Sequence, residues 1–350
     1  MNYQNRFYLD IAKPEDSYGI KKIFDDDDFS GKIAVKFSRD PDPYKSFLND
    51  GEHIILPIAK DAFTHEIVGV GGCVIRQGFI NGELINTAYL TGMKILKSHR
   101  GKVNVIKHAY KLIGERAREF NPFFYTTILK SNIFAIKLLE KPHRDVPPYI
   151  YSGEYTVFCL GTKGKVSNKK YRLVQGHSLE ISNFYKEHLP KYNLSPKDEW
   201  LYGLKSDDFF SLRSESGNIL AACAIWDQQE YKQYTITHYG GIYKLFSLLP
   251  IDLLGYPKMP KVSIPSNYAS IALLIIPEEN KNIAETFLKL VLSKAKKYEF
   301  LMLGLFENHP LFDIAKSLKH IKYQSRFYNV DYGEQIKLDE RPIMLEVGFL

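Results

Sequence analysis

The sequence has few cysteines, no clustered histidines and no long apolar run, and each absence excludes a class of protein. Three cysteines stand alone among 350 residues, without the paired spacing of a disulfide framework or a zinc site. The ten histidines are scattered and form no HExxH or HxH pattern, so we expect no metal. Apolar runs stay below the roughly 18 residues of a membrane-spanning helix. We therefore expect a cytoplasmic chain without a membrane partner.

The sequence also lacks a block of basic residues. The net charge is +7, but Lys and Arg are spread along the chain, and the sharpest run of like charge is the acidic one at 25–28. A nucleic-acid-binding protein concentrates its basic residues in runs or on one face, so we expect no nucleic-acid partner. The basic excess fits a solvated surface or a field that favours an anionic ligand such as a phosphate-bearing cofactor. The oligomeric state stays open.

The chain contains enough apolar material for two domains. Apolar residues make up 45% of the sequence and charged residues 25%, which are ordinary values for globular proteins. A strand, a polar loop, a long helix, a strand, an asparagine and a short helix occur in that order in each half of the chain. We therefore predict a first domain at 1–160, a polar linker at 161–170 and a second domain at 171–335. The closing segment 336–350 is apolar towards its end, and we expect it to dock on the body as a strand.

The segment from Tyr89 to Lys141 carries the most informative pattern. A strand at 85–96 leads into the basic loop His99-Arg100-Gly101-Lys102, and apolar residues then recur at helical spacing from Val103. The first N–H groups of a helix have no intrahelical partner, and the helix dipole attracts anions there. This arrangement favours a phosphate site. An ordinary turn with solvated charges is the alternative.

The same segment resembles the GCN5-related N-acetyltransferase superfamily. That family has a strand, a loop of the form Arg-Gly-x-Gly-x-Gly or Ala, a long helix, a strand, and a helix reading Asn-x-x-Ala-x-x-Leu-Tyr-Glu-Lys. Here the loop runs from Arg100 to Val105, and the later helix reads Asn132-Ile133-Phe134-Ala135-Ile136-Lys137-Leu138-Leu139-Glu140-Lys141. The resemblance implies an α+β fold in which a central mixed sheet is flanked by helices, in two consecutive domains.

The resemblance also implies a cofactor site for acetyl-CoA as co-substrate. Backbone groups near Met93 and Ile95 would meet the pantetheine arm and the acetyl group, and Asn132 would lie close to the cofactor. The loop amides would cradle the pyrophosphate; they belong to Arg100, Gly101, Lys102, Val103, Asn104 and Val105. Two family glycines are replaced by Val103 and Val105, and the tyrosine that often acts as the general acid is replaced by Leu139.

Two hypotheses follow for the function. The first is an acyl-CoA-dependent N-acyltransferase that moves an acetyl group to a small-molecule or peptide amine, with Glu83 and Tyr89 near the cofactor strand as candidate base or acid. The second is a catalytically silent protein of the same fold that binds a ligand or partner. The second half has no glycine in the corresponding loop at 277–282, which carries two acidic residues. We expect that half to be a degenerate domain without cofactor.

Overall fold

The computed structural model describes residues 6–350 apart from 27, 30, 145, 165, 167–169, 278–279 and 334–335. Its α-helices are α1 (Ser17–Asp25), α2 (Pro43–Leu48), α3 (Ile106–Ala117), α4 (Ile133–Leu139), α5 (Leu179–His188), α6 (Ile242–Phe246), α7 (Lys281–Lys294) and α8 (Phe312–Ser317). Its strands are β1 (Phe7–Ile11), β2 (Ile33–Ser38), β3 (His53–Ile55), β4 (Pro57–Asp61), β5 (Ile67–Ile80), β6 (Glu83–Ile95), β7 (Phe123–Leu129), β8 (Tyr149–Leu160), β9 (Arg172–Gln175), β10 (Ser195–Pro196), β11 (Phe209–Arg213), β12 (Ile219–Trp226), β13 (Gln233–Tyr239), β14 (Tyr268–Ile275), β15 (Phe300–Phe306) and β16 (His320–Val330).

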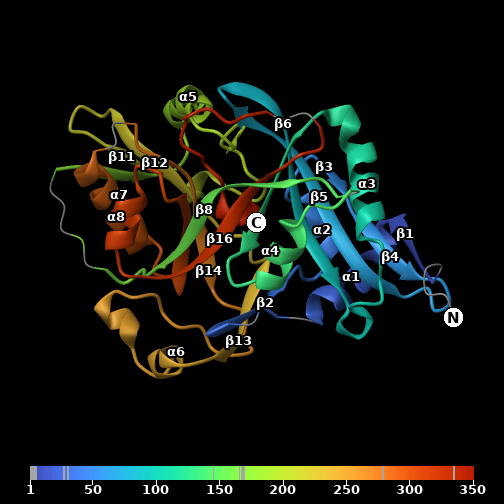
Figure 1. Ribbon diagram of the computed structural model, residues 1–350. Helices are drawn as coiled ribbons and strands as arrows, with labels where there is room; N and C mark the ends of the chain where they lie inside the picture. Colours follow the sequence, from blue (N-terminus) through green and yellow to red (C-terminus); the bar gives the residue numbers. More distant parts are fainter. Residues whose placement is uncertain are drawn as a thin grey trace.

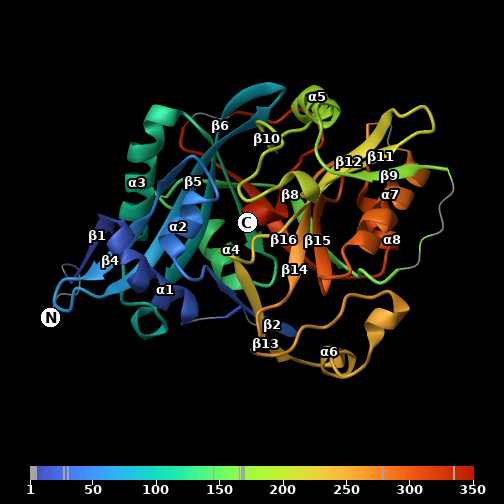
Figure 2. The ribbon, with the colours of Figure 1, turned by 180° about the vertical axis from the view of Figure 1, so that it is seen from behind.

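One mixed sheet runs through the whole molecule (Figure 1). Its order is β1-β4-β5-β6-β7-β16-β8-β15-β14-β12-β11-β9, and β3 and β10 pair with β5. Two neighbouring pairs are parallel, β6 with β7 and β14 with β15, while the other pairs described are antiparallel. Helices pack on both faces of this sheet (Figure 2). The predicted α+β class, a mixed sheet flanked by helices, is confirmed.

The two halves of the chain exchange their last strands. β8 ends the first half, yet both its neighbours, β16 and β15, come from the second half. β16 ends the second half and lies between β7 and β8 of the first half. A small ribbon of β2 and β13 joins the halves again at the lower edge in Figure 1. The order of elements along the chain gave no indication of this exchange, because it depends on pairing between distant strands.

Several local predictions need correction. The polar stretch 25–51, which shows no clear periodicity in the sequence, contains β2 as well as α2, because β2 finds its partner in the second half. The long helix begins at Ile106 instead of Val103. The end of the chain is no strand: it makes one bridge at Ile343 and a 3₁₀ turn at Val347–Phe349, because its polar backbone groups bond to side chains and loops.

The linker predicted at 161–170 lies partly outside the described residues. In the part that is described, Thr162 is buried and its hydroxyl donates to the carbonyl of Tyr298 at 3.0 Å. Gly161 packs against the backbone of Gly255 and Tyr256 so closely that a side chain would collide with it. The start of this segment is therefore fixed to the second half. None of the described helices is long and apolar enough to cross a membrane.

Candidate functional site

The parallel strands β6 and β7 separate part-way along their length. They pair at three positions, from Thr87 opposite Phe123 to Tyr89 opposite Tyr125. Beyond this point β6 stays with β5 as far as Ile95, and β7 stays with β16 as far as Leu129. The Thr126 hydroxyl donates to the carbonyl of Leu90 at 2.6 Å. The two strands therefore leave a split between them, and polar backbone groups along its edges are available to a ligand.

A β-bulge lies on the β6 side of this split. The register between β5 and β6 shifts, so that Gly92 and Met93 together face the single residue Gly71. Gly92 has φ +67° and lies against the rings of Phe24 and Phe47, a position that only glycine occupies without strain. Met93, predicted to meet the cofactor, is 42% exposed at the bulge. Ile95, at the end of β6, is half-buried against the core beneath α1.

The basic loop after β6 uses some of its amides internally. The N–H of Arg100 donates to the carbonyl of Lys97, and those of Lys102 and Val103 donate to the carbonyl of His99. Among the hydrogen bonds of the described chain, none uses the N–H of Gly101, Asn104 or Val105. Gly101 is exposed with φ +73°, which gives the loop its sharp turn.

The helix that follows is open at its N-terminus. Val105 is the N-cap of α3, and in the described chain no side chain caps this end. Several N–H groups of the first turn therefore point outwards without an intrahelical partner. Val103 is 7% exposed and packs into the core beside Leu96. Its branched side chain therefore points away from the open amides, and this substitution for glycine leaves the loop surface accessible.

The helix α4 begins beside the other edge of the split. The side chain of Asn132 accepts from the N–H of Ala135 at 3.1 Å, so this predicted ligand residue is the N-cap of α4. Ile133 and Phe134 are 52% and 78% exposed. Leu139, at the position of the family tyrosine, is buried in the core under α3 and cannot deliver a proton to the split.

Tyr89 lies at the last paired position before the split. It is 4% exposed, and its hydroxyl is 2.8 Å from that of Thr127 on β7. Burial raises the pKa of the Tyr89 phenol to about 12, so the hydroxyl stays protonated near neutral pH. Glu83, the other predicted catalytic residue, is exposed at the start of β6. Six residues of strand, roughly 20 Å at about 3.3 Å each, separate it from Tyr89. The structure does not bring these two residues together.

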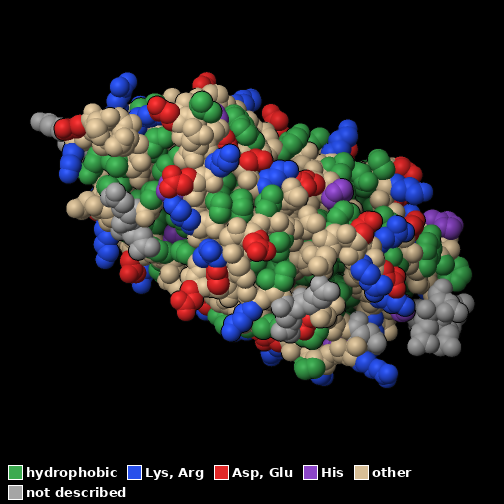
Figure 3. Space-filling model, turned by 90° about the horizontal axis from the view of Figure 1, so that it is seen from above, with side chains coloured by type: hydrophobic (Ala, Val, Ile, Leu, Met, Phe, Trp, Pro, Cys, Tyr) green, Lys and Arg blue, Asp and Glu red, His purple; other side chains and the backbone are tan. Residues whose placement is uncertain are grey.

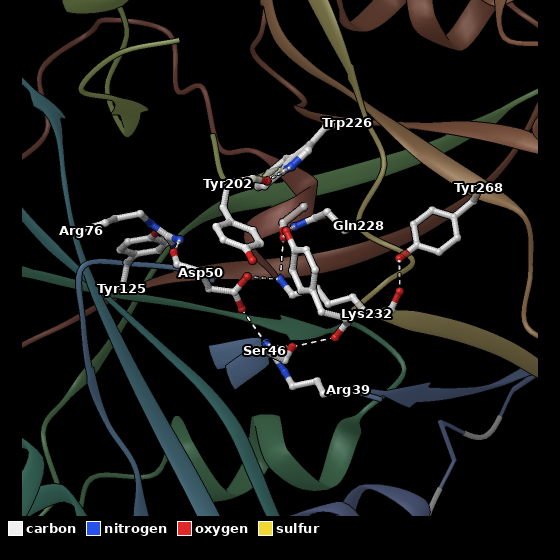
Figure 4. Close-up of polar contacts among 12 residues, drawn as sticks. Arg39, Ser46, Asp50, Arg76, Tyr125, Tyr202, Trp226, Gln228, Lys232 and Tyr268 are labelled. Atoms are coloured by element: carbon white, nitrogen blue, oxygen red, sulfur yellow. Dashed lines mark hydrogen bonds and ion pairs between the residues drawn. The ribbon is translucent and has the colours of Figure 1, made fainter. Parts of the chain in front are cut away.

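A buried charged cluster lies behind Tyr89, and local sequence patterns did not reveal it (Figure 4). Asp50 accepts from Arg39 at 2.7 Å and pairs with Lys232 at 2.8 Å. Arg76 donates to the backbone carbonyl of Asp50 and to the hydroxyl of Tyr125, whose ring lies 5.2 Å from that of Tyr89. Burial lowers the pKa of Lys232 to about 7, although Asp50 opposes that shift. Since Lys232 belongs to the second half, the cluster ties the two halves together.

The second half repeats the split and the bulge. β14 and β15 pair at three positions and separate beyond Ser270 and Met302. The register between β12 and β14 shifts so that Leu273 and Leu274 face one residue, and Leu273 has φ +55°. This non-glycine residue in the left-handed region marks the same bend that Gly92 makes in the first half.

The C-terminal segment occupies this second split. Ile343, Met344, Leu345 and Glu346 line a small cavity together with residues of β14 and β15. The Glu346 carboxylate accepts from the N–H of Leu273, at the bulge, at 2.8 Å. The hydroxyl of Tyr155 donates to the carbonyl of Leu345 at 2.6 Å. The C-terminal segment thus hydrogen-bonds groups at the second split, whereas the corresponding backbone groups at the first split stay open. The acidic pair Glu278 and Glu279, predicted to oppose a cofactor here, lies outside the described residues.

Comparison with solved structures decides the fold. A GCN5-related glucosamine N-acetyltransferase region in a fungal GH3 β-N-acetylglucosaminidase aligns with a TM-score of 0.61 at 14% identity, over 92% of this chain and 38% of that one. The N-myristoyltransferase of Saccharomyces cerevisiae, with bound myristoyl-CoA, aligns with 0.57 at 9% identity, over 95% and 80%. A GCN5-related N-acetyltransferase from Sphaerobacter thermophilus aligns with 0.54 at 12% identity, over 95% and 98%. The chain has the GCN5-related N-acetyltransferase fold.

The N-acetyltransferase fold spans both halves of the chain. The alignments cover more than nine-tenths of it, which agrees with a repeated arrangement of two units in one sheet. No family model matches the sequence, and no curated protein matches it significantly. The resemblance seen in the sequence is therefore confirmed at the level of fold.

Two further observations on this N-acetyltransferase fold concern metal binding and surface charge. The part of the chain that is described contains no group of three or more His, Cys, Asp or Glu side chains placed to hold a metal. On the face seen from above, basic and acidic side chains are interspersed (Figure 3). Sequence analysis did not identify three buried charged residues, which are Asp50, Lys232 and Glu346. Only Glu346 had a local signal, as the single acid in an apolar stretch.

Proposed function

We propose that this protein transfers an acyl group from acyl-CoA to an amine, in the split between β6 and β7. The observation that carries the proposal is the parallel pair that opens beyond Tyr89 and Tyr125, with a bulge at Gly92 and Met93 on one edge. Such a split offers unpaired backbone groups to the amide-bearing arm of CoA. Acetyl-CoA is the simplest donor, and the acceptor is a small-molecule or peptide amine.

The residues of the loop and of α3 fit the phosphate end of the donor. The amides of Gly101, Asn104 and Val105 and the uncapped first turn of α3 would bind the pyrophosphate, with Arg100 and Lys102 adding positive charge. The internal bonds of Arg100, Lys102 and Val103 shape the turn instead of binding the ligand. In this proposal Asn132 acts as a helix cap, and the exposed Ile133 and Phe134 offer apolar contact to the cofactor.

The chemical step needs a proton for the departing thiolate. The amine nitrogen bonds to the thioester carbonyl carbon, the carbon–sulfur bond breaks, the sulfur takes a proton and the amine loses one to water. Tyr89 is protonated near neutral pH and sits where the split begins, so it is our candidate acid. The Arg76–Tyr125 pair packs behind it and fixes its ring. Glu83 has no role in this proposal.

The second half has no acyl-CoA site in this proposal. Glu346 already bonds the Leu273 amide at the bulge, and residues 343–346 lie in the split. We therefore expect one molecule of acyl-CoA per chain. Titration calorimetry with acetyl-CoA measures this number directly, and two equivalent sites per chain would refute the degenerate second half.

Ligand binding and thiol release test the proposal in two steps. A donor present at 100 times its dissociation constant stabilises the folded chain by about 2.7 kcal/mol, which a thermal shift detects. Release of free CoA thiol is then followed with a panel of amines and peptides. No thermal shift at millimolar acetyl-CoA or longer acyl-CoA would refute the proposal. A shift without thiol release for any acceptor would favour the second hypothesis, a silent binding protein, which the apolar Leu139 at the position of the family tyrosine supports.

A further inference from the structure

Exposed apolar side chains are concentrated in one segment between β13 and β14. In the described chain 22 large apolar side chains are exposed, and eight of them lie within residues 242–264. They are Ile242, Leu245, Leu248, Leu249, Leu253, Leu254, Val262 and Ile264, with exposed fractions from 46% to 78%. Scattered exposed leucines are ordinary in soluble proteins, but a group of this size marks an interaction surface. We call residues 242–264 the leucine-rich segment.

The leucine-rich segment is held firmly by the body of the protein. Just before the segment, the N–H of Gly240 donates to the carbonyl of Lys32 at 2.7 Å. The hydroxyl of Tyr239 donates to the carbonyl of Pro260, within the segment, at 2.8 Å. Asp252 is buried and pairs with Lys163 at 2.5 Å. The leucines are therefore exposed on a fixed scaffold made of α6 and a 3₁₀ turn at Ile251–Leu254.

The segment projects from the body of the protein. In both ribbon views α6 and the turn after it stand out from the lower edge of the molecule, beyond the β2–β13 ribbon (Figures 1 and 2). A projecting element that carries exposed apolar side chains can insert them into the boundary between lipid headgroups and acyl chains. Exposed leucines of α6 and of the 3₁₀ turn would enter this boundary at shallow depth, as the apolar face of an interfacial helix does.

The exposed charge of the segment has one sign. Its basic residues are Lys244, Lys258 and Lys261, all exposed, and its only acidic residue is the buried Asp252. Lys258 also pairs with Glu299, which leaves Lys244 and Lys261 as the main charges beside the leucines. Cations at the rim of an apolar projection complement the anionic headgroups of a membrane surface.

We propose that the leucine-rich segment docks this protein on an anionic lipid surface. The leucines enter the boundary between headgroups and acyl chains, and Lys244 and Lys261 contact the headgroups. This docking needs no spanning helix, so it is compatible with the absence of one among the described residues. It revises the expectation of a chain without a membrane partner, which rested only on the lack of a spanning segment. The proposal does not depend on acyl transfer.

Flotation of the full chain with lipid vesicles tests the proposal. We expect binding to phosphatidylcholine vesicles that contain phosphatidylserine, weaker binding without phosphatidylserine, and loss of the difference at high salt. The variant L248S/L253S/L254S should bind at least about tenfold more weakly, because the side chains that enter the lipid are removed. The charge variant K244E/K261E should lose the preference for phosphatidylserine.

Matched controls come from α5, far from the segment in sequence. Leu179 is 77% exposed and Lys186 is exposed, so L179S and K186E make single substitutions of the same kinds on another surface and should bind like the parent, whereas L248S and K244E alone should each weaken binding. Absence of parent binding to either vesicle would overturn the proposal, and so would equal binding by the leucine variant. Light scattering without lipid gives a third outcome: a dimer of the parent that becomes a monomer in the leucine variant would assign the surface to a second copy of the chain instead.

Discussion

At the scale of single residues, burial sets the protonation of the groups that matter most here. Tyr89 in the first half and Glu346 in the second both lie where a parallel strand pair separates, and burial raises the pKa of each side chain. The phenol keeps a proton that it can donate. The carboxyl, with a pKa raised to about 7, takes the place of a ligand at the bulge. In the proposed mechanism, a strand residue at the first split thus donates a proton, whereas a residue of the C-terminal segment fills the second split.

Replacing Tyr89 with phenylalanine removes the candidate acid with little change in packing. We expect kcat to fall about 100-fold, which is at the low end of general acid–base contributions, while the KM for acyl-CoA changes little. Steady-state thiol release measures both quantities. Glu83→Gln is the control, since that residue lies roughly 20 Å along the strand, and it should match the parent. Equal activity of Tyr89→Phe and the parent would remove Tyr89 from the mechanism.

Glu346→Gln tests the buried carboxyl through the pH dependence of stability. The folded-state pKa is raised from 4.5 to about 7 by burial, so the free energy of unfolding falls as pH rises from about 4.5 to 7. Glutamine keeps an acceptor for the Leu273 amide without this penalty. We expect the variant to exceed the parent by up to about 3 kcal/mol at pH 8 and to approach it at pH 5. Urea unfolding at the two pH values measures the difference, and a gap independent of pH would contradict this account.

At the scale of elements, the two bulges open the sheet, and a backbone conformation unusual for most residues makes each of them. Gly92 reaches it with φ +67° and Leu273 with φ +55°. In the first half the loop and α3 continue from the bulge towards the proposed phosphate site. In the second half the C-terminal segment closes the corresponding space. The same strand geometry therefore gives an open split on one side and a filled one on the other.

Gly92→Ala should disturb the open split. An added Cβ would lie 3.1 Å from the ring of Phe47, at a φ that alanine avoids. We expect a loss of about 1–2 kcal/mol in stability and weaker binding of acetyl-CoA. Gly217→Ala is the matched control, because it has φ +91° but no atom within 4 Å of the added Cβ. It should lose similar stability and keep the affinity of the parent in calorimetry. Equal affinity for Gly92→Ala would show that the bulge does not contact the cofactor.

At the scale of the whole molecule, the exchange of strands makes the halves interdependent. β8 and β16 each lie between strands of the other half, and the buried Asp50–Lys232 pair joins the halves a second time. The boundary predicted at 161–170 separates the element patterns of the two halves. It does not separate the sheet, because strands on either side of it pair across the division.

Expression of the halves apart tests this interdependence. We expect a fragment 1–160 to be unfolded or aggregated on its own, because β8 loses both partners and β7 becomes an open edge. Co-expression with a fragment 171–350 should restore a soluble pair, since the strands can pair between chains. Circular dichroism and size-exclusion chromatography report both results. A fragment 1–160 that folds cooperatively by itself would contradict the interdependence.

Local sequence determined much of the architecture. Apolar spacing predicted the strand β6 and the helix α3, and the motif from Asn132 to Lys141 predicted the fold that the structural comparison confirmed. These elements can be predicted from sequence because periodicity and turn chemistry depend on residues that are near neighbours along the chain. The start of α3 at Ile106 was missed by three residues, because Val103 is buried and its N–H donates to the carbonyl of His99 in the turn that precedes the helix.

Tertiary structure alone decided the rest. The Asp50–Lys232 pair joins residues far apart in the sequence, and the exchange of β8 and β16 depends on strands from opposite halves. Glu346 gained its role only when folding placed it beside the Leu273 amide. The partner of a buried charge or an edge strand depends on which distant residue the fold places beside it, so no short-range sequence pattern predicts it. Local sequence therefore determined elements such as β6 and α3, while long-range pairing formed β2 and decided which split stays open.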